Sequence, residues 1–232
     1  MEFTKVLIKG KLIKRYKRFF IDVKLSDEIV TAHCPNTGSM KGLLDKGNEV
    51  FISKNDNPKR KLKYTLEIIK VKKNLVGINT HFANKIAYHG LSNNLVKEVS
   101  NSDNIKPEVF FDKETRFDFL IEKNKQKIFV EVKNVTLFRD EKIAEFPDSV
   151  TSRGSKHLKT LITAIKKGYK SYLLFLVQIQ GVENFKIAKD IDKEYYENYL
   201  LAKKAGVVFL AYRCKINLNE IKIEKKIKIV NA

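Results

Sequence analysis

Two short runs in the middle of the chain alternate between apolar and charged side chains, as the strands of a half-buried sheet do. Residues 116–120 read Arg-Phe-Asp-Phe-Leu, and residues 129–133 read Phe-Val-Glu-Val-Lys. The segment between them is polar and rich in lysine, which favours a tight turn centred near Asn124 and Lys125. The pattern therefore predicts a β-hairpin.

The same alternation predicts which side chains share a face, because successive residues of a strand point to opposite sides. A turn at 124–125 would set Asp118 directly opposite Glu131, with Lys133 on the same face. Val130 and Val132 would face the other side. In the first strand, the expected faces are Arg116, Asp118 and Leu120 on one side, and Phe117, Phe119 and Ile121 on the other.

The first third of the chain consists of short β-patterned segments separated by polar turns, without a convincing amphipathic helix. An all-β module is the economical interpretation, and this number of strands suits a small barrel. The expected strands cover residues 6–13, 18–25, 29–33, 49–53, 64–71 and 75–79.

The rest of the chain mixes helical and strand patterns, after a linker expected near residues 83–90. The expected order is a helix over 91–99, three β segments, a helix that ends at Gly168, a buried strand over 172–177, a helix over 193–205 and a strand over 207–212. A Rossmann fold would instead alternate strand and helix from the start. We therefore expect an all-β domain over residues 1–82 and an α/β domain over residues 83–232.

The charged face of the hairpin is suited to a Mg²⁺ or Mn²⁺ site that hydrolyses phosphodiesters. Mg²⁺ takes oxygen ligands and keeps several waters, so Asp118, Glu131 and the carbonyl of Val132 are candidate ligands. The ion would polarise the phosphate and supply a water of lowered pKa, and Lys133 would position that water. The alternative is an exposed hairpin whose charges are merely solvated, because so short a motif occurs often by chance.

Composition favours a polyanionic partner. The 232 residues carry a net charge of +19, and the isoelectric point is near 9.7. Lysines greatly outnumber arginines, so part of this charge could reflect codon bias.

No apolar run is long enough to cross a membrane and no secretory signal is evident, which predicts a cytoplasmic protein. Cys34 and Cys214 lie too far apart for a zinc motif.

Basic and aromatic residues interleave at positions 14–20, a mixture that can hold phosphates and stack bases. Arg15 and Arg18 are the candidate phosphate contacts, with Tyr16 between them as a further candidate. An ordinary strand with exposed basic neighbours is the alternative. A second basic loop contains Lys59 and Arg60, and it could equally clamp a nucleic acid or be a solvated turn.

Over nearly its whole length, the chain resembles the sugar fermentation stimulation protein A family. The matching stretches are Arg-Tyr-Lys-Arg-Phe at 15–19, His-Cys-Pro-Asn-Thr-Gly-Ser-Met at 33–40, Asn57 with Lys-Arg-Lys at 59–61, Glu-Val-Lys-Asn-Val-Thr-Leu at 131–137 and Phe-Pro-Asp-Ser-Val-Thr-Ser-Arg-Gly-Ser-Lys-His-Leu at 146–158. The resemblance implies an N-terminal OB-like barrel and a C-terminal PD-(D/E)XK domain, the restriction-endonuclease-like α/β fold. Asp118 matches the isolated acid of that motif, and residues 131–133 match its E-X-K element.

The resemblance also implies DNA binding and nuclease activity, and it makes Glu108 a further candidate acid near the metal. At the start of the helix that follows Pro147, backbone donors and the cations Arg153 and Lys156 could bind a phosphate. His157 is a further candidate there, with a structural hydrogen bond as the alternative.

Two functions follow from these observations. One is a DNA-binding, Mg²⁺- or Mn²⁺-dependent nuclease, for which RNA is a second candidate substrate. The other is a DNA-binding regulator of sugar-utilisation genes that does not catalyse. General polyanion binding through lysines is a third reading. The sequence leaves the oligomeric state open.

Overall fold

The alternating segments at the start of the chain form a closed barrel. The computed structural model describes residues 1–230. Strands β1 to β5 follow the circular order β1-β2-β3-β5-β4, and a parallel pairing of β3 with β5 closes the circle. Buried apolar side chains such as Leu12, Ile21, Ile52 and Leu66 fill the interior. The strands are β1 (Ile8–Tyr16), β2 (Phe20–Lys24), β3 (Ile29–His33), β4 (Glu49–Lys54) and β5 (Tyr64–Val71).

This circular order is that of an OB-type Greek-key barrel, which confirms the expected fold of the N-terminal part. A sixth strand, β6 (Asn74–Gly77), pairs with β5 and leads out of the barrel. It reaches the segment after strand β11 (Lys170–Val177), where Gly77 N–H donates to the carbonyl of Gln178 at 2.9 Å. The N-terminus lies against the hairpin of β13 (Val208–Ile216) and β14 (Ile221–Lys226), because Met1 and Ile221 exchange backbone hydrogen bonds of 2.9 Å.

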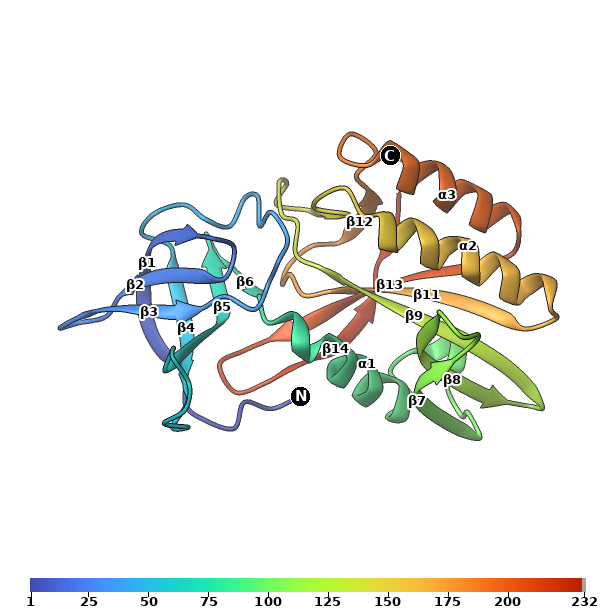
Figure 1. Ribbon diagram of the computed structural model, residues 1–232, viewed down its shortest axis with the longest axis horizontal. Coiled ribbons are helices and arrows are strands. Elements are labelled where there is room, and N and C mark those ends of the chain that lie inside the picture. The colour runs from blue at the N-terminus through green and yellow to red at the C-terminus, as the bar shows by residue number, and fades with distance from the viewer. Residues whose placement is uncertain (231–232) are drawn as a thin grey trace.

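The second part is a three-layer α/β sandwich beside the barrel (Figure 1). Its central mixed sheet has the order β14-β13-β11-β9-β8-β7. Helix α1 covers one face, whereas α2 and α3 cover the other. The elements of this sandwich are α1 (Ala83–Ser92), β7 (Asn104–Phe110), β8 (Arg116–Lys123), β9 (Gln126–Val135), α2 (Ser152–Lys166), β11 (Lys170–Val177), α3 (Lys193–Lys204), β13 (Val208–Ile216) and β14 (Ile221–Lys226). The order of helix, three strands, helix and strand is the one expected, so the fold class is confirmed.

The leading helix of this part lies earlier than predicted. Helix α1 occupies the segment that was expected to be a linker, and the expected helix over 91–99 is wrong. Asn94 has a positive φ of 58°, which ends the helix, and only the short 3₁₀ turn η2 (Lys97–Val99) follows. Buried residues along α1 fall at helical spacing: Ala83, Ile86, Ala87, Gly90 and Leu91.

A small parallel sheet beside the sandwich was not predicted. It has the order β10-β12-β15, from β10 (Ile143–Phe146), β12 (Asn184–Ile187) and β15 (Lys228–Ile229). These strands are only four, four and two residues long, which is too short for an alternating pattern to show.

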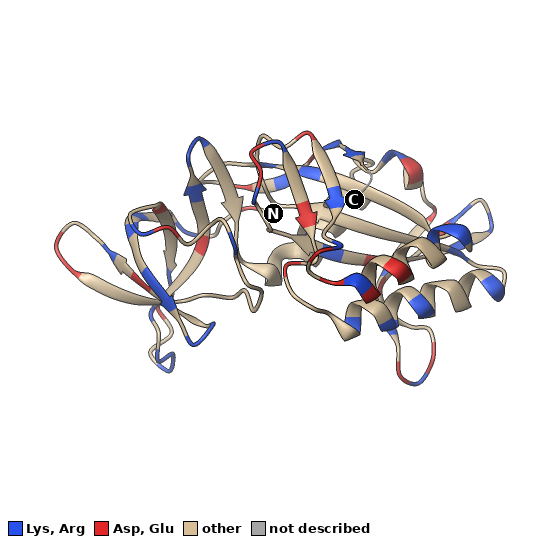
Figure 2. Ribbon diagram, turned by 90° about the horizontal axis from the view of Figure 1, so that it is seen from above, with Lys and Arg blue, Asp and Glu red and all other residues tan. Residues whose placement is uncertain are grey.

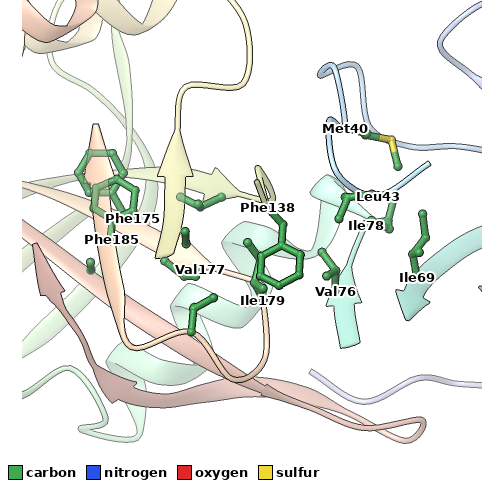
Figure 3. Close-up of a cluster of buried hydrophobic side chains, with 14 of the residues drawn as sticks. Met40, Leu43, Ile69, Val76, Ile78, Phe138, Phe175, Val177, Ile179 and Phe185 are labelled. Carbon is green, nitrogen blue, oxygen red and sulfur yellow. The ribbon is translucent and has the colours of Figure 1, made fainter. Parts of the chain in front are cut away.

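Barrel and sandwich share one hydrophobic core (Figure 3). Met40, Leu43 and Val76 from the barrel side continue into Phe138 and Ile179 of the sandwich. The expected boundary between two domains after residue 82 stays a prediction, and residues 231–232 of the expected second domain lie outside the described range. Over residues 1–230, no helix is both long and apolar enough to cross a membrane.

Candidate active site

The predicted hairpin is formed by β8 and β9, and its turn lies where the sequence placed it. Asn124 and Lys125 both have positive φ values, 50° and 63°, as a two-residue type I′ turn requires. Pairing runs back from this turn to Phe119 opposite Val130. The next positions, Asp118 and Glu131, follow the last pair but are not themselves paired, and their side chains bind Asn84 of α1 and His157 of α2, so they do not share one face as expected.

The predicted division of the β8 faces is wrong at Phe117. Phe117 packs with the cluster under α2 and α3, whereas Phe119 and Ile121 pack on the opposite face under α1. The alternation breaks around Asp118, and the neighbouring strand β7 is irregular at the same level. There, Glu108 has a φ of +55°, and the pairing with β8 skips that position. Both faces of the hairpin are therefore largely apolar, and the charged groups lie where the regular ladder ends.

The Asp118 carboxylate accepts a backbone hydrogen bond from β9, which in a regular ladder a backbone carbonyl would accept. Its Oδ2 accepts the N–H of Val132 at 2.7 Å, and its Oδ1 accepts the side-chain amide of Asn84 at 2.7 Å. Burial and the nearby charge of Glu131 raise the pKa of Asp118. Asn84 was missed from sequence because α1 had been placed too late. The helical spacing of apolar residues from Ala83 was the signal that could have found it.

Glu131 is the centre of a buried ionic cluster. It is only 3% exposed, on the face of the sheet covered by α2. Its Oε1 accepts from the Lys133 ammonium at 2.7 Å and also contacts Nδ1 of His157, which lies 3.4 Å from the same ammonium. Burial raises the pKa of Glu131, but Lys133 and His157 outweigh it and hold that pKa below its usual value. The other carboxylate oxygen, Oε2, is buried without a hydrogen-bond partner among the described residues.

Tyr195 on α3 lies near this cluster and was not predicted. Its side chain is fully buried, and within residues 1–230 its hydroxyl has no hydrogen-bond partner. Burial first, and then the charge of Glu131, raise the pKa of Tyr195 well above its usual value. No sequence signal distinguishes this tyrosine from an ordinary core aromatic residue.

Glu108 lies close to Asp118 but on the surface. Its side chain is 46% exposed and pairs with Arg116 at 2.7 Å. The amide of Asn84, which binds Asp118, lies 3.5 Å from a Glu108 oxygen. Across residues 1–230, no group of three or more His, Cys, Asp or Glu side chains is arranged to hold a metal ion.

The two arginines predicted to contact phosphate differ in their surroundings. The guanidinium of Arg15 donates to the carbonyls of Arg18, Asn36 and Gly38 at 2.9, 2.6 and 2.9 Å. Arg15 therefore holds two barrel loops together, and its predicted role as a phosphate contact does not fit. Arg18 is exposed and lines a cavity of about 300 Å³ between the barrel and the start of α2. Tyr16 stacks on Phe20 with ring centroids 5.5 Å apart and is only half-buried.

The second basic loop lies apart from this cavity. Arg60 donates to the Thr65 hydroxyl at 3.3 Å and lines a different cavity of about 440 Å³ on the barrel. Lys59 beside it is exposed.

The start of α2 presents the predicted cations to solvent. The Thr151 side chain caps the helix by accepting the N–H of Gly154 at 3.0 Å. Arg153 is exposed in the first turn, and Lys156 pairs with Glu114 at 2.9 Å on the surface. His157, one residue further, points inward to Glu131.

Comparison with known proteins identifies relatives along the whole chain. Residues 13–78 match the family model described as the SfsA N-terminal OB domain, and residues 81–220 match the model described as the sugar fermentation stimulation protein RE domain. A sugar fermentation stimulation protein homolog of Pelagibacter ubique is 86% identical over 100% of both chains. A homolog of Maricaulis maris is 42% identical, over 99% of this chain and 98% of its own.

A solved structure supports the same assignment. The chain resembles the structure of Pyrococcus furiosus SfsA in complex with Ca²⁺, with a TM-score of 0.88 and 27% identity. The match covers 99% of this chain and 98% of the other. The chain therefore belongs to the sugar fermentation stimulation protein family.

Proposed function

We propose that this protein is a nucleic-acid phosphodiesterase that uses Mg²⁺ or Mn²⁺, with DNA as the first candidate substrate and RNA as the second. Asp118, Glu131 and the carbonyl of Val132 would hold the ion. The buried, unpartnered Oε2 of Glu131 is the observation that carries the proposal, because an orphaned carboxylate oxygen needs a cation or a donor.

The donor set suits a hard cation. All three proposed ligands offer oxygen, and Mg²⁺ would fill its remaining coordination positions with water and a phosphate oxygen. The raised pKa of Asp118 also fits, since a bound cation would offset the repulsion from Glu131. The relative from Pyrococcus furiosus was solved with Ca²⁺, a divalent cation that takes the same oxygen ligands. Glu108 would act at the edge of the site through Asn84.

A bound ion would polarise the scissile phosphate and supply a water of lowered pKa. Lys133 would hold that water or stabilise charge on the phosphoryl oxygens, because its ammonium is fixed by Glu131 and has further N–H groups to donate. His157 contacts the same Glu131 oxygen, so it would fix the carboxylate and keep Lys133 in place.

Basic side chains around the site would bind the substrate backbone. Lys and Arg occur on both the barrel and the sandwich (Figure 2), consistent with the net charge of +19. Arg18, Arg153 and Lys156 would contact phosphates near the start of α2, whereas Lys59 and Arg60 would contact a more distant part of the strand. OB barrels commonly bind single-stranded nucleic acid, which supports contacts of the barrel residues with a part of the strand away from the active site.

The test is cleavage of labelled single- and double-stranded DNA and RNA with Mg²⁺, Mn²⁺ or EDTA. We expect metal-dependent cleavage that is lost in Glu131→Gln and Lys133→Ala, while both variants still bind nucleic acid. Lys166→Ala, which removes an exposed lysine from the last turn of α2, is the matched control and should cleave normally. If folded wild-type protein binds DNA in a salt-sensitive way but cleaves nothing, the protein is the non-catalytic DNA-binding regulator instead.

A further inference from the structure

A third cavity lies beside Asp118, on the α1 face of the sheet. Its volume is about 310 Å³, and its walls are mainly apolar, formed by Tyr88 of α1, Pro107 of β7 and Phe119 of β8. Asp118 itself lines one side, and the exposed Lys85 lies at the rim. The cavity therefore shares one of the proposed catalytic carboxylates.

The cavity presents an aromatic ring to solvent. Tyr88 is 45% exposed, whereas Phe119 beneath it is 1% exposed. The two rings are stacked, with centroids 6.2 Å apart and an interplanar angle of 25°. Phe119 thus supports the orientation of the Tyr88 ring, and a flat aromatic ligand could extend the stack or lie against it.

We propose that this cavity binds an unpaired nucleobase of the nucleotide that adjoins the scissile phosphate. The inference rests on the proposed function, because only a phosphate held at Asp118 brings its own nucleotide within reach of the cavity. Among flat aromatic ligands, a nucleobase combines a ring that stacks on tyrosine with a backbone phosphate for Lys85. The cavity combines an apolar floor with polar side chains around it, as ligand sites commonly do; these are Asn84, Lys85, Glu108 and Asp118.

This assignment narrows the substrate class to nucleic acid that is single-stranded where it is cut. A base inside a duplex keeps both faces against its neighbours, so it must leave the stack before it can enter a pocket. Extrusion costs least when the nucleotide is already unpaired. The preferred substrates are therefore single strands, flaps or frayed ends, and an intact duplex is cut slowly or not at all.

The first experiment measures base stacking without cleavage. Single-stranded DNA carrying 2-aminopurine at successive positions is bound with Mg²⁺ to Lys133→Ala protein, which keeps the proposed metal ligands but should not cleave, and stacking quenches the probe. We expect quenching at one position, retained when Tyr88→Phe is added and lost with Tyr88→Leu, which also weakens binding about 10-fold. Tyr196→Leu removes a half-buried tyrosine on α3, across the sheet, and should change neither property.

The second experiment relates that position to the cut. In otherwise wild-type protein, Tyr88→Leu should slow cleavage of a single strand, and an abasic site next to the scissile phosphate should slow wild type and abolish the effect of the substitution. Equal loss on normal and abasic strands, or equal cleavage of paired and unpaired substrates, would overturn the proposal. If no substrate is cleaved but the Tyr88-dependent quenching remains, the proposed function fails and the base site stands on its own. If cleavage occurs without Tyr88-dependent quenching, only the base site fails.

Discussion

Replacing Asp118 with asparagine should stabilise the metal-free protein while abolishing its activity. The carboxylate is partly buried and repelled by Glu131, so its charge disfavours the folded state until a cation binds. Asparagine removes that charge at nearly the same volume. Functional sites commonly contain groups that destabilise the folded protein. Removing such a group should raise the free energy of unfolding by about 1 kcal/mol.

The structure shows why the hydrogen bonds of Asp118 need not be lost. The new amide oxygen can accept the Val132 N–H, and the new amide nitrogen can donate to Asn84 once the Asn84 amide rotates. Only the 3.5 Å contact between Asn84 and Glu108 would be weakened. For a chain of this size, a gain of about 1 kcal/mol raises the melting temperature by about 2–4 °C.

The gain in stability of Asp118→Asn over wild type should increase as the pH rises. Because the pKa of Asp118 is raised in the folded state, the penalty is absent below the unfolded value of about 4 and grows as pH rises through the folded value. Asp118→Asn should therefore gain little near pH 4.5 and most near pH 7.5. The charge of Glu131 has the opposite effect on stability. Its pKa is lowered in the folded state, so the charge contributes stability that is lost as pH falls. Glu131→Gln should accordingly destabilise the protein near neutral pH.

The assay is thermal unfolding of wild type and Asp118→Asn in EDTA across this pH range, repeated with Mg²⁺ at pH 7.5. Mg²⁺ should raise the melting temperature of wild type but not of the variant, because the ion binds only the folded site. A variant that is less stable than wild type in EDTA at pH 7.5, or a difference that does not change with pH, would refute the electrostatic argument. An equal rise with Mg²⁺ in both proteins would remove Asp118 from the metal site.

Two further pairs of substitutions separate structural from binding roles. Arg15→Met should lower stability by about 2–3 kcal/mol in thermal or urea unfolding, because it leaves loop carbonyls without their charged donor. Arg18→Met should leave stability unchanged but weaken DNA binding and reduce the log–log salt slope by about one; the reverse pattern would exchange the two roles. Gly42→Ala should cost more than about 2 kcal/mol, since its φ is +82° and a Cβ would lie 1.9 Å from the carbonyl oxygen of Phe138. Gly47→Ala also has a positive φ but meets nothing within 4 Å, so a cost of about 1 kcal/mol is expected, and equal losses would contradict the steric argument.

Elements with a long, regular pattern could be predicted from sequence. The barrel strands β3 and β5 begin and end at the predicted residues, and the apolar run in β11 is buried as expected. Helix α2 combines a clear apolar stripe with a threonine cap and a glycine stop. In each case the local sequence pattern and the tertiary packing favour the same structure, so the pattern alone was sufficient to predict the element.

Elements that depend on tertiary contacts could not be predicted in the same way. The apolar stripe of α1 begins at Ala83, but Asn84 and Lys85 lie outside that stripe, and only the folded structure shows that Asn84 binds Asp118 and that Lys85 lines the cavity. The small sheet has strands too short to carry a period, and its partners are far apart in sequence. Arg15 and Arg18 look alike in the sequence, and only the folded loops show that the guanidinium of Arg15 is already bound to carbonyls.

The candidate site lies where the strict alternation of side chains along the strand breaks. Strict alternation predicted that Asp118 and Glu131 would lie directly opposite each other on one face, but the ladder ends one position earlier, at Phe119 and Val130. A fully regular ladder would also have paired the two backbones and kept Phe117 on the face of Phe119. The break at Asp118, matched by the positive φ of Glu108 in β7, lets the Asp118 carboxylate take the Val132 N–H and leaves the strands unpaired beyond Phe119. In the proposed chemistry, that unpaired end would offer oxygen atoms of both strands to the cation, so the irregularity that the sequence pattern did not predict is the feature on which the proposal depends.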